Sequence, residues 1–323
     1  MSLKKVIACI KRNKNFLVTT HTSLEGDALG SELAFYGLLK ALGKNATIVN
    51  QDNVPYGYGF LAGLKHVKKF KKNLKGIKFD CFVNLDCSDS RRCGQVYKLN
   101  KDNKPILNID HHISNEKFGE INWIEPTVSS CSEMIYRLFK ELRVPFDRDT
   151  ALALYVGMVT DTGCFRYTNT TSFTHKAVFE LLRYNINASE VYRNIYGNIP
   201  FQDMKLLAKI LPTIRMAASG KIAWFQIKRA LLNRRAISLD LTEHTLSFAR
   251  AIKGVEVAVL FRENLDTKNE VRVNLRSQGR VDVNKVASFF SGGGHRTASG
   301  FVIRGKLREV IKKTLNKIRE SLK

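Results

Sequence analysis

The sequence predicts an α/β protein: an N-terminal parallel sheet with helices on both faces, followed by a smaller α/β domain. Short apolar, β-branched runs alternate with segments of helical periodicity through the first half of the chain. A helical stretch interrupted by Gly197 and Pro200 then precedes a second group of strand-like runs. We therefore expect a domain over residues 1–190, a helical linker over 191–215 and a second domain over 216–323.

The first domain is expected to begin with an amphipathic helix and to hold four buried strands. The strands are residues 16–20, 45–50, 79–85 and 105–109. Helical periodicity covers 28–42, which stops at Gly43, and also 149–160 and 172–182. Asp149 is the expected N-cap of the helix over 149–160.

The second domain is expected to contain strands over 221–227, 255–261 and 271–276. A helix over 283–290 leads into a glycine run, and a basic amphipathic helix begins at Lys306. Glycines at 292, 293 and 294 let backbone N–H groups approach an anion closely, although a flexible turn is the alternative. Arg276 and Ser277, at the end of a strand, are expected to bind phosphate.

The composition favours an intracellular protein with anionic partners. The chain has 323 residues and a formal net charge of +24. A positive potential gathers polyanions, but we assign about half of the excess to lysines on solvated faces, so charge favours nucleotide substrates only weakly. The six cysteines form no Cys-x-x-Cys pair, and no apolar stretch approaches the roughly 18–20 residues of a membrane span. We expect a soluble, cytoplasmic protein without a membrane partner.

Acidic and histidine side chains follow four of the predicted elements. They are His21, Glu25 and Asp27; Asp86; Asp110, His111 and His112; and Asp161. Because ligand sites of parallel sheets lie at the carboxyl ends of the strands, we expect these groups to gather at one edge. Their oxygen and imidazole donors are typical of a two-metal hydrolytic site, with Mn²⁺ favoured and Mg²⁺ or Co²⁺ as alternatives.

Each cluster also has a structural interpretation. Glu25 or Asp27 could cap the following helix, and Asp86 could be a turn residue. Two adjacent histidines beside the strand-terminal Asp110 favour function over structure. A carboxylate such as Asp161 is unfavourable at a helix C-terminus, which also favours a functional role.

These residues resemble the motifs of the DHH phosphoesterase family, named for the triplet seen here at 110–112. The family's first motif, His-x-x-x-Asp-x-Asp, is matched with Glu25 in place of one aspartate, and residues 160–166 resemble its fourth. Residues 292–300 are similar to the glycine-rich signature of the DHH-associated C-terminal domain. Order, spacing and length are most similar to the NrnA-type subgroup, which degrades very short RNAs and dephosphorylates 3′-phosphoadenosine 5′-phosphate (PAP).

The resemblance implies a role for each residue. One metal would be held by His21, Glu25 and Asp86, and the other by Asp27, Asp86, His111 and Asp161. Asp110 would orient a histidine, and His112 would contact the phosphate or assist the leaving group. Arg276, Ser277, Gly293, Gly294 and His295 would hold the substrate across a domain cleft.

The resemblance also implies an activity: Mn²⁺-dependent hydrolysis of short oligoribonucleotides to mononucleotides, of PAP to AMP, or of both. The first alternative is hydrolysis of a cyclic dinucleotide such as c-di-AMP or of its linear product. The second alternative is a nucleotide- or RNA-binding protein that has lost catalysis. A RecJ-like exonuclease on long DNA is disfavoured, because that subgroup carries further nucleic-acid-binding domains. A homodimer is left open.

Overall fold

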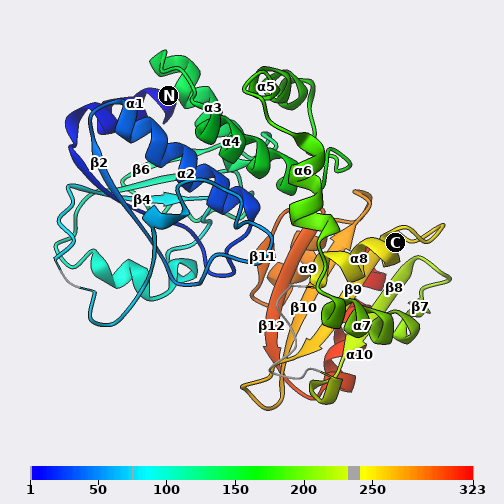
Figure 1. Cartoon of the computed structure of the whole chain (residues 1–323). Helices are drawn as coiled ribbons and strands as arrows, with labels where there is room; N and C mark the ends of the chain where they lie inside the picture. Colours follow the sequence, from blue (N-terminus) through cyan, green and yellow to red (C-terminus); the bar gives the residue numbers. More distant parts are fainter. Residues whose placement is uncertain (1, 75, 232–240, 323) are drawn as a thin grey trace. The chain divides into compact units, whose positions relative to one another are not determined.

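The computed structural model describes residues 2–74, 76–231 and 241–322. The chain divides into two compact units, Met1–Asn198 and Ile199–Lys323 (Figure 1). Within the described residues each unit contains a six-stranded sheet with helices packed against it. The α/β class predicted from the sequence is confirmed.

The sheet of unit 1 is parallel, and its strands lie in the order β3-β2-β1-β4-β5-β6. Their bounds are β1 (Asn15–Thr19), β2 (Asn45–Asn50), β3 (Val67–Lys69), β4 (Cys81–Leu85), β5 (Ile106–Asp110) and β6 (Ile121–Ile124). The four predicted strands form the centre, and the short β3 and β6 at the edges were not predicted. Strand order reverses between β1 and β4, the place where ligands bind in sheets of this kind.

Several helices accompany this sheet. They are α1 (Ser2–Arg12), α2 (Gly26–Ala41), α3 (Cys131–Leu142), α4 (Arg148–Asp161), α5 (Ser172–Leu182), α6 (Ala188–Tyr192), the 3-10 segments η1 (Leu64–His66) and η2 (Ser90–Leu99), and the π-helical turn η3 (Arg193–Gly197). The predicted N-cap of α4, Asp149, is wrong. Asp147 caps α4 by accepting a hydrogen bond from the backbone N–H of Thr150 at 2.7 Å, because the cap residue must precede the first helical turn.

Both faces of the unit 1 sheet are buried, which explains why its strands are apolar at consecutive positions. In β1, Phe16 and Val18 pack on one face, together with residues of α1, α2, α3 and α4. Leu17 points to the opposite face, where it packs with Val96 of η2 and with loop residues. Successive side chains of a strand alternate between faces, so the two cores share the same strands.

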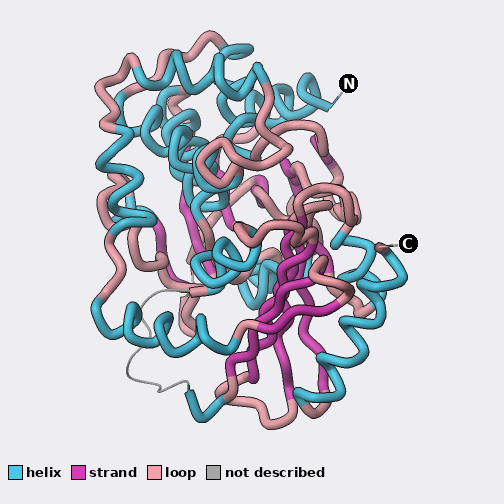
Figure 2. The backbone as a smooth tube through the Cα atoms, turned by 90° about the vertical axis from the view of Figure 1, so that its right-hand side faces the viewer, coloured by secondary structure: helices cyan, strands magenta, loops and turns pink. Residues whose placement is uncertain are grey.

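The sheet of unit 2 is mixed, in the order β11-β12-β10-β9-β8-β7. Strands β8 and β9 are parallel and the other neighbours antiparallel; Figure 2 shows them in magenta. The bounds are β7 (Arg215–Ala217), β8 (Ile222–Ile227), β9 (Val257–Glu263), β10 (Glu270–Ser277), β11 (Gly293–Gly294) and β12 (Ala298–Arg304). The helices are α7 (Phe201–Ile210), η4 (Leu211–Thr213), η5 (Arg229–Leu231), α8 (Thr242–Arg250), α9 (Val283–Phe289) and α10 (Leu307–Ser321).

The segment predicted as a linker is helical and is shared between the units. Helix α6 and the turn η3 belong to unit 1, whereas Leu206 and Ile210 of α7 are buried in the core of unit 2. Helix α10 corresponds to the predicted basic tail, and its Val310 and Ile318 are buried in the other core of that unit. Across the described residues, no helix is both long and apolar enough to span a membrane.

Candidate metal centre

The acidic and histidine residues of unit 1 gather at the carboxyl ends of β1, β4 and β5. His21 follows β1, Asp86 follows β4 directly, and Asp110 is the last residue of β5. The C-terminal end of α4 brings Asp161 to the same place, 3.5 Å from His111. Strand order reverses between β1 and β4 here, so the cluster occupies the expected ligand position of a parallel sheet.

Asp86 lies between two groups of donors. Its Oδ2 is 3.5 Å from Nε2 of His21, and its Oδ1 is 3.4 Å from Nε2 of His111. The side chain is 2% exposed, and its backbone has a positive φ of 53°, which is uncommon outside glycine. A carboxylate with one oxygen on each side can bridge two cations.

The first group consists of His21, Glu25 and Asp86, whose donor atoms lie within 4.8 Å of one another. Nδ1 of His21 lies 2.7 Å from the carbonyl oxygen of Thr22. A carbonyl can only accept, so Nδ1 carries the proton and the lone pair of the neutral ring lies on Nε2, which faces the carboxylates. Glu25 is at the N-cap position of α2 but makes no side-chain capping bond, so capping does not explain it.

The second group consists of Asp27, Asp86 and His111, with Asp161 beside it. Nε2 of His111 is 3.7 Å from Oδ2 of Asp27. The Asp27 carboxylate accepts hydrogen bonds from the backbone N–H groups of Cys131 at 2.6 Å and Ser132 at 2.9 Å. These N–H groups begin α3, and a helix N-terminus favours an anion, so α3 holds this carboxylate in place.

Asp110 holds the two following histidines in place through hydrogen bonds. It is fully buried, and its Oδ1 lies 2.6 Å from Nδ1 of His112 and accepts the backbone N–H of His111 at 2.8 Å. Oδ2 accepts the amide of Asn115 at 2.6 Å. Asn115 was not predicted, although a polar residue in the loop after a strand-terminal acid is the available signal. These bonds fix the ring of His112.

The electrostatics of the cluster call for positive charge. Burial and the neighbouring Asp86 raise the pKa of Asp27 to about 6, although His111 opposes this. Burial also raises the pKa of Asp161 well above its usual value, with His111 again opposing. Burial and Arg92 lower the pKa of His21, but contacts with Asp86 and Glu25 outweigh them and raise it to about 10. The carboxylates repel one another, and cations would relieve this repulsion.

The donor set fits divalent cations. Within the described residues, His21 Nε2 and Asp86 Oδ1 are buried without a hydrogen-bond partner. The imidazole–carboxylate separations of 3.4–3.7 Å are long for hydrogen bonds. They suit two ligands of one cation, each bound at roughly 2.0–2.2 Å. Carboxylates mixed with imidazoles are acceptable to Mn²⁺ and similar ions.

The five candidates in unit 2 lie on β10, on β11 and in the turn after β11, and β12 separates the two strands in the sheet. Arg276 of β10 pairs in register with Ala298 of β12, and its Nε donates to Glu243 at 3.0 Å. Ser277 is buried. Gly293 and Gly294 form β11 and pair with β12, and His295 forms the turn between the two strands.

Packing explains at least one of these glycines. Gly294 has a φ of 135°, and a Cβ there would lie 2.5 Å from the carbonyl oxygen of Ala298. The turn therefore needs glycine at this position whether or not an anion binds. Which of the unit 2 candidates touch substrate stays a prediction.

Comparison with known families matches both halves of the chain. Residues 15–158 match the N-terminal domain of the DHH family, and residues 239–323 match the DHHA1 domain. The chain is 32% identical over 299 residues to the bifunctional oligoribonuclease and PAP phosphatase NrnA of Bacillus subtilis, covering 92% of this chain and 91% of that one. The NrnA of Thermus thermophilus is 28% identical over 306 residues, covering 94% and 89%.

Solved structures share the fold. An exopolyphosphatase-related protein from Bacteroides fragilis superposes with a TM-score of 0.86 at 24% identity, covering 99% of this chain and 96% of that one. RecJ from Thermus thermophilus in complex with Mn²⁺ has a TM-score of 0.53 at 12% identity, and the match covers 98% of this chain and 54% of RecJ.

Proposed function

Because the chain belongs to the DHH family and to the group of relatives named NrnA, we propose that it is a metal-dependent phosphoesterase. Its proposed reactions are hydrolysis of short oligoribonucleotides to mononucleotides and of PAP to AMP. The observation that carries the proposal is the Asp86 carboxylate, which faces His21 with one oxygen and His111 with the other.

Two divalent cations, most simply Mn²⁺, would occupy the two donor groups. His21, Glu25 and Asp86 would hold one, and Asp27, Asp86, His111 and Asp161 the other. Bound there, a metal pair supplies an activated water and stabilises the attacking and leaving oxygens of phosphoryl transfer. RecJ, which has this fold, has been solved with Mn²⁺.

The protein's own residues prepare the site for this chemistry. Helix α3 fixes Asp27 through two backbone N–H groups, and the Thr22 carbonyl fixes the ring of His21. The Asp110–His112 hydrogen bond leaves Nε2 of His112 as the nitrogen to contact the phosphate or to give a proton to the leaving oxygen. Preset orientation of this kind reduces the entropy lost on reaching the transition state.

The second unit is assigned to substrate holding. Arg276, Ser277, Gly293, Gly294 and His295 would bind the terminal phosphate or nucleotide. In this proposal residues 1–190 catalyse, 191–215 connect and 216–323 limit the length of RNA accepted. The assignment rests on the DHHA1 match and on the pairing of both β10 and β11 with β12.

A substrate panel tests the proposal. A two-nucleotide RNA, PAP and c-di-AMP are assayed side by side with Mn²⁺, using the parent chain and Asp86→Ala. We expect turnover of the RNA, of PAP or of both, and at least a hundredfold loss in Asp86→Ala, because that change removes a ligand of both cations. Turnover of c-di-AMP alone would instead support the cyclic-dinucleotide alternative. Tight binding of all three without turnover would support a binding protein.

A further inference from the structure

The backbone of Arg92 is hydrogen-bonded to the loops that carry the metal centre. Its carbonyl oxygen accepts a hydrogen bond from the N–H of Thr22, the residue after His21, at 2.6 Å. Its own N–H donates to the carbonyl of Asp89 at 3.0 Å. The segment after β4, which includes η2, is therefore tied to the loop after β1, and both carry residues of the first donor group. The position of Arg92 follows from these bonds and does not depend on its side chain.

The side chain of Arg92 has unused hydrogen-bonding capacity. Its Nη1 lies 3.4 Å from the hydroxyl of Ser88, a residue that is 5% exposed and two positions after Asp86. In the described part of the chain, no carboxylate oxygen lies within ion-pairing distance of this half-buried guanidinium. Its charge nevertheless reaches the donor group, since after burial it is the largest influence that lowers the pKa of His21.

The neighbouring Arg91 is different. Its guanidinium is 77% exposed and pairs with Asp89 at 2.6 Å and with Glu116 at 2.8 Å. The two adjacent arginines thus have different environments. Arg91 forms ion pairs at the surface, whereas Arg92 forms no ion pair among the described residues and lies near the buried acids of the metal centre. A guanidinium without an ion pair in such a place is available to an anion, and Arg suits phosphate through its forked donors.

We propose that Arg92 and Ser88 form a phosphate-binding subsite on the His21 side of the metal centre. This inference rests on the proposed function and adds to it a group that contacts the non-bridging oxygens of the substrate's scissile phosphate. The subsite distinguishes substrates by charge. A phosphomonoester such as the 3′-phosphate of PAP carries about two negative charges and a phosphodiester about one, so the monoester depends more on the guanidinium.

The test compares Arg92→Ala, Arg92→Lys and Arg91→Ala, each loaded with Mn²⁺, on PAP and on a two-nucleotide RNA. We expect Arg92→Ala to lower kcat/KM about 10- to 100-fold on PAP and less on the RNA, as for a lost hydrogen bond to a charged group. Arg92→Lys restores part of the activity because it keeps the point charge. Arg91→Ala stays within about twofold of the parent.

Bound Mn²⁺ and melting temperature are measured for the same variants. Unchanged values in Arg92→Ala would exclude a loss of metal or of folding as the cause. The subsite proposal would be wrong if Arg92→Ala lost kcat/KM equally on both substrates and bound fewer Mn²⁺ ions. It would also be wrong if Arg92→Ala kept the parental kcat/KM on both substrates. If the parent itself hydrolyses neither substrate, the proposed function is wrong. The subsite is then tested by the Kd of inorganic phosphate: a higher Kd in Arg92→Ala than in the parent would support it, and an equal Kd would contradict it.

Discussion

Glu25 stands where the DHH motif normally has an aspartate. Its donor atom lies 3.5 Å from Nε2 of His21, and its side chain is 61% exposed, whereas His21 and Asp86 are buried. Glu25 is at the N-cap position of α2 and makes no side-chain capping bond.

Replacing Glu25 tests its ligand role. Glu25→Ala is expected to lower turnover about 10- to 100-fold and to weaken Mn²⁺ binding at the first donor group, because a charged ligand is lost. Glu25→Asp should keep two ions. The matched control is Glu141→Ala, which removes an exposed carboxylate from α3. Unchanged metal content and turnover in Glu25→Ala would exclude the role, and markedly higher activity in Glu25→Asp at equal stability would show that the longer side chain is costly.

Glu32 of α2 is a buried acid outside the donor groups. One of its oxygens accepts the amide of Asn50 at 2.7 Å, and the other has no partner among the described residues. Burial raises its pKa to about 8, although the Asn50 bond opposes this. The unfolded chain titrates near 4.3. Between these values the folded protein holds a proton that the unfolded chain releases, so this contribution to the free energy of unfolding falls as pH rises.

Glu32→Gln keeps the shape and removes this titration. In EDTA, we expect it to match the parent near pH 4.5 and to be more stable by on the order of 1–3 kcal/mol at pH 8. Thermal unfolding across this pH range checks the difference. A stability difference that does not change with pH would contradict the account.

At the scale of elements, local signals predicted the ends of the strands well. Each central strand is a short apolar run, and a polar residue follows it, so the positions of His21, Asp86 and Asp110 could be read from the sequence. The hydrogen-bond partner of Asp27 could not be read from the sequence. Its carboxylate bonds to Cys131, 104 positions away, and no local pattern encodes such a contact. The Ser130–Glu133 spacing is a capping signal that would have revealed α3 itself, though not its contact.

The packing of α2 on α4 gives an element-scale prediction. A Cβ on Gly30 would lie 2.4 Å from the carbonyl oxygen of Ala153, a backbone atom that cannot move aside. Gly30→Ala should therefore destabilise the protein by about 1–3 kcal/mol, despite the higher helix propensity of alanine. Gly59→Ala, where a Cβ meets no atom of the described residues within 4 Å, is the control. Equal unfolding midpoints for the two variants in urea would contradict close helix packing.

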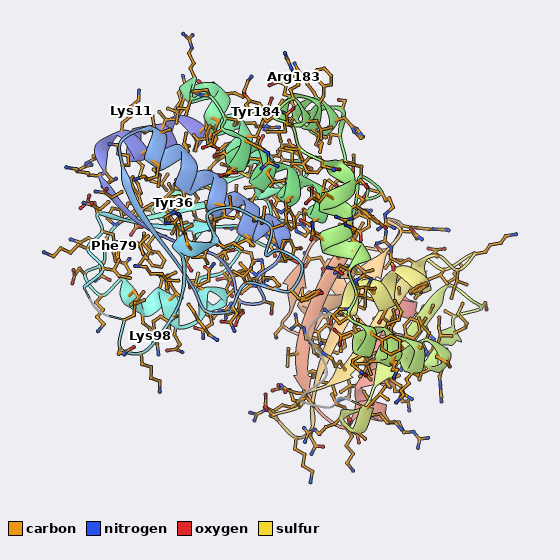
Figure 3. All side chains as sticks on the ribbon, viewed as in Figure 1. Lys11, Tyr36, Phe79, Lys98, Arg183 and Tyr184 are labelled. Carbon is orange, nitrogen blue, oxygen red and sulfur yellow. The ribbon has the colours of Figure 1, made fainter. Side chains whose placement is uncertain are left out.

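At the scale of the whole molecule, not all of the basic side chains behind the net charge of +24 lie together. Figure 3 shows Lys11, Lys98 and Arg183 extending from separate parts of unit 1. Composition thus predicted an anionic substrate only weakly, whereas motif order along the chain predicted the family and the fold. The boundary between the units, after Asn198, depends on which core each helix packs into, and periodicity alone does not determine that.

Asp86 would be a ligand of both divalent cations, and counting the metal ions bound per chain tests this role. The chain is stripped with EDTA, reloaded with Mn²⁺ and weighed by native mass spectrometry, beside Asp86→Ala and the surface control Glu141→Ala. We expect two ions per chain in the parent and the control and at most one in Asp86→Ala. A parent that binds fewer than two ions, or an Asp86→Ala variant that keeps both, would contradict it.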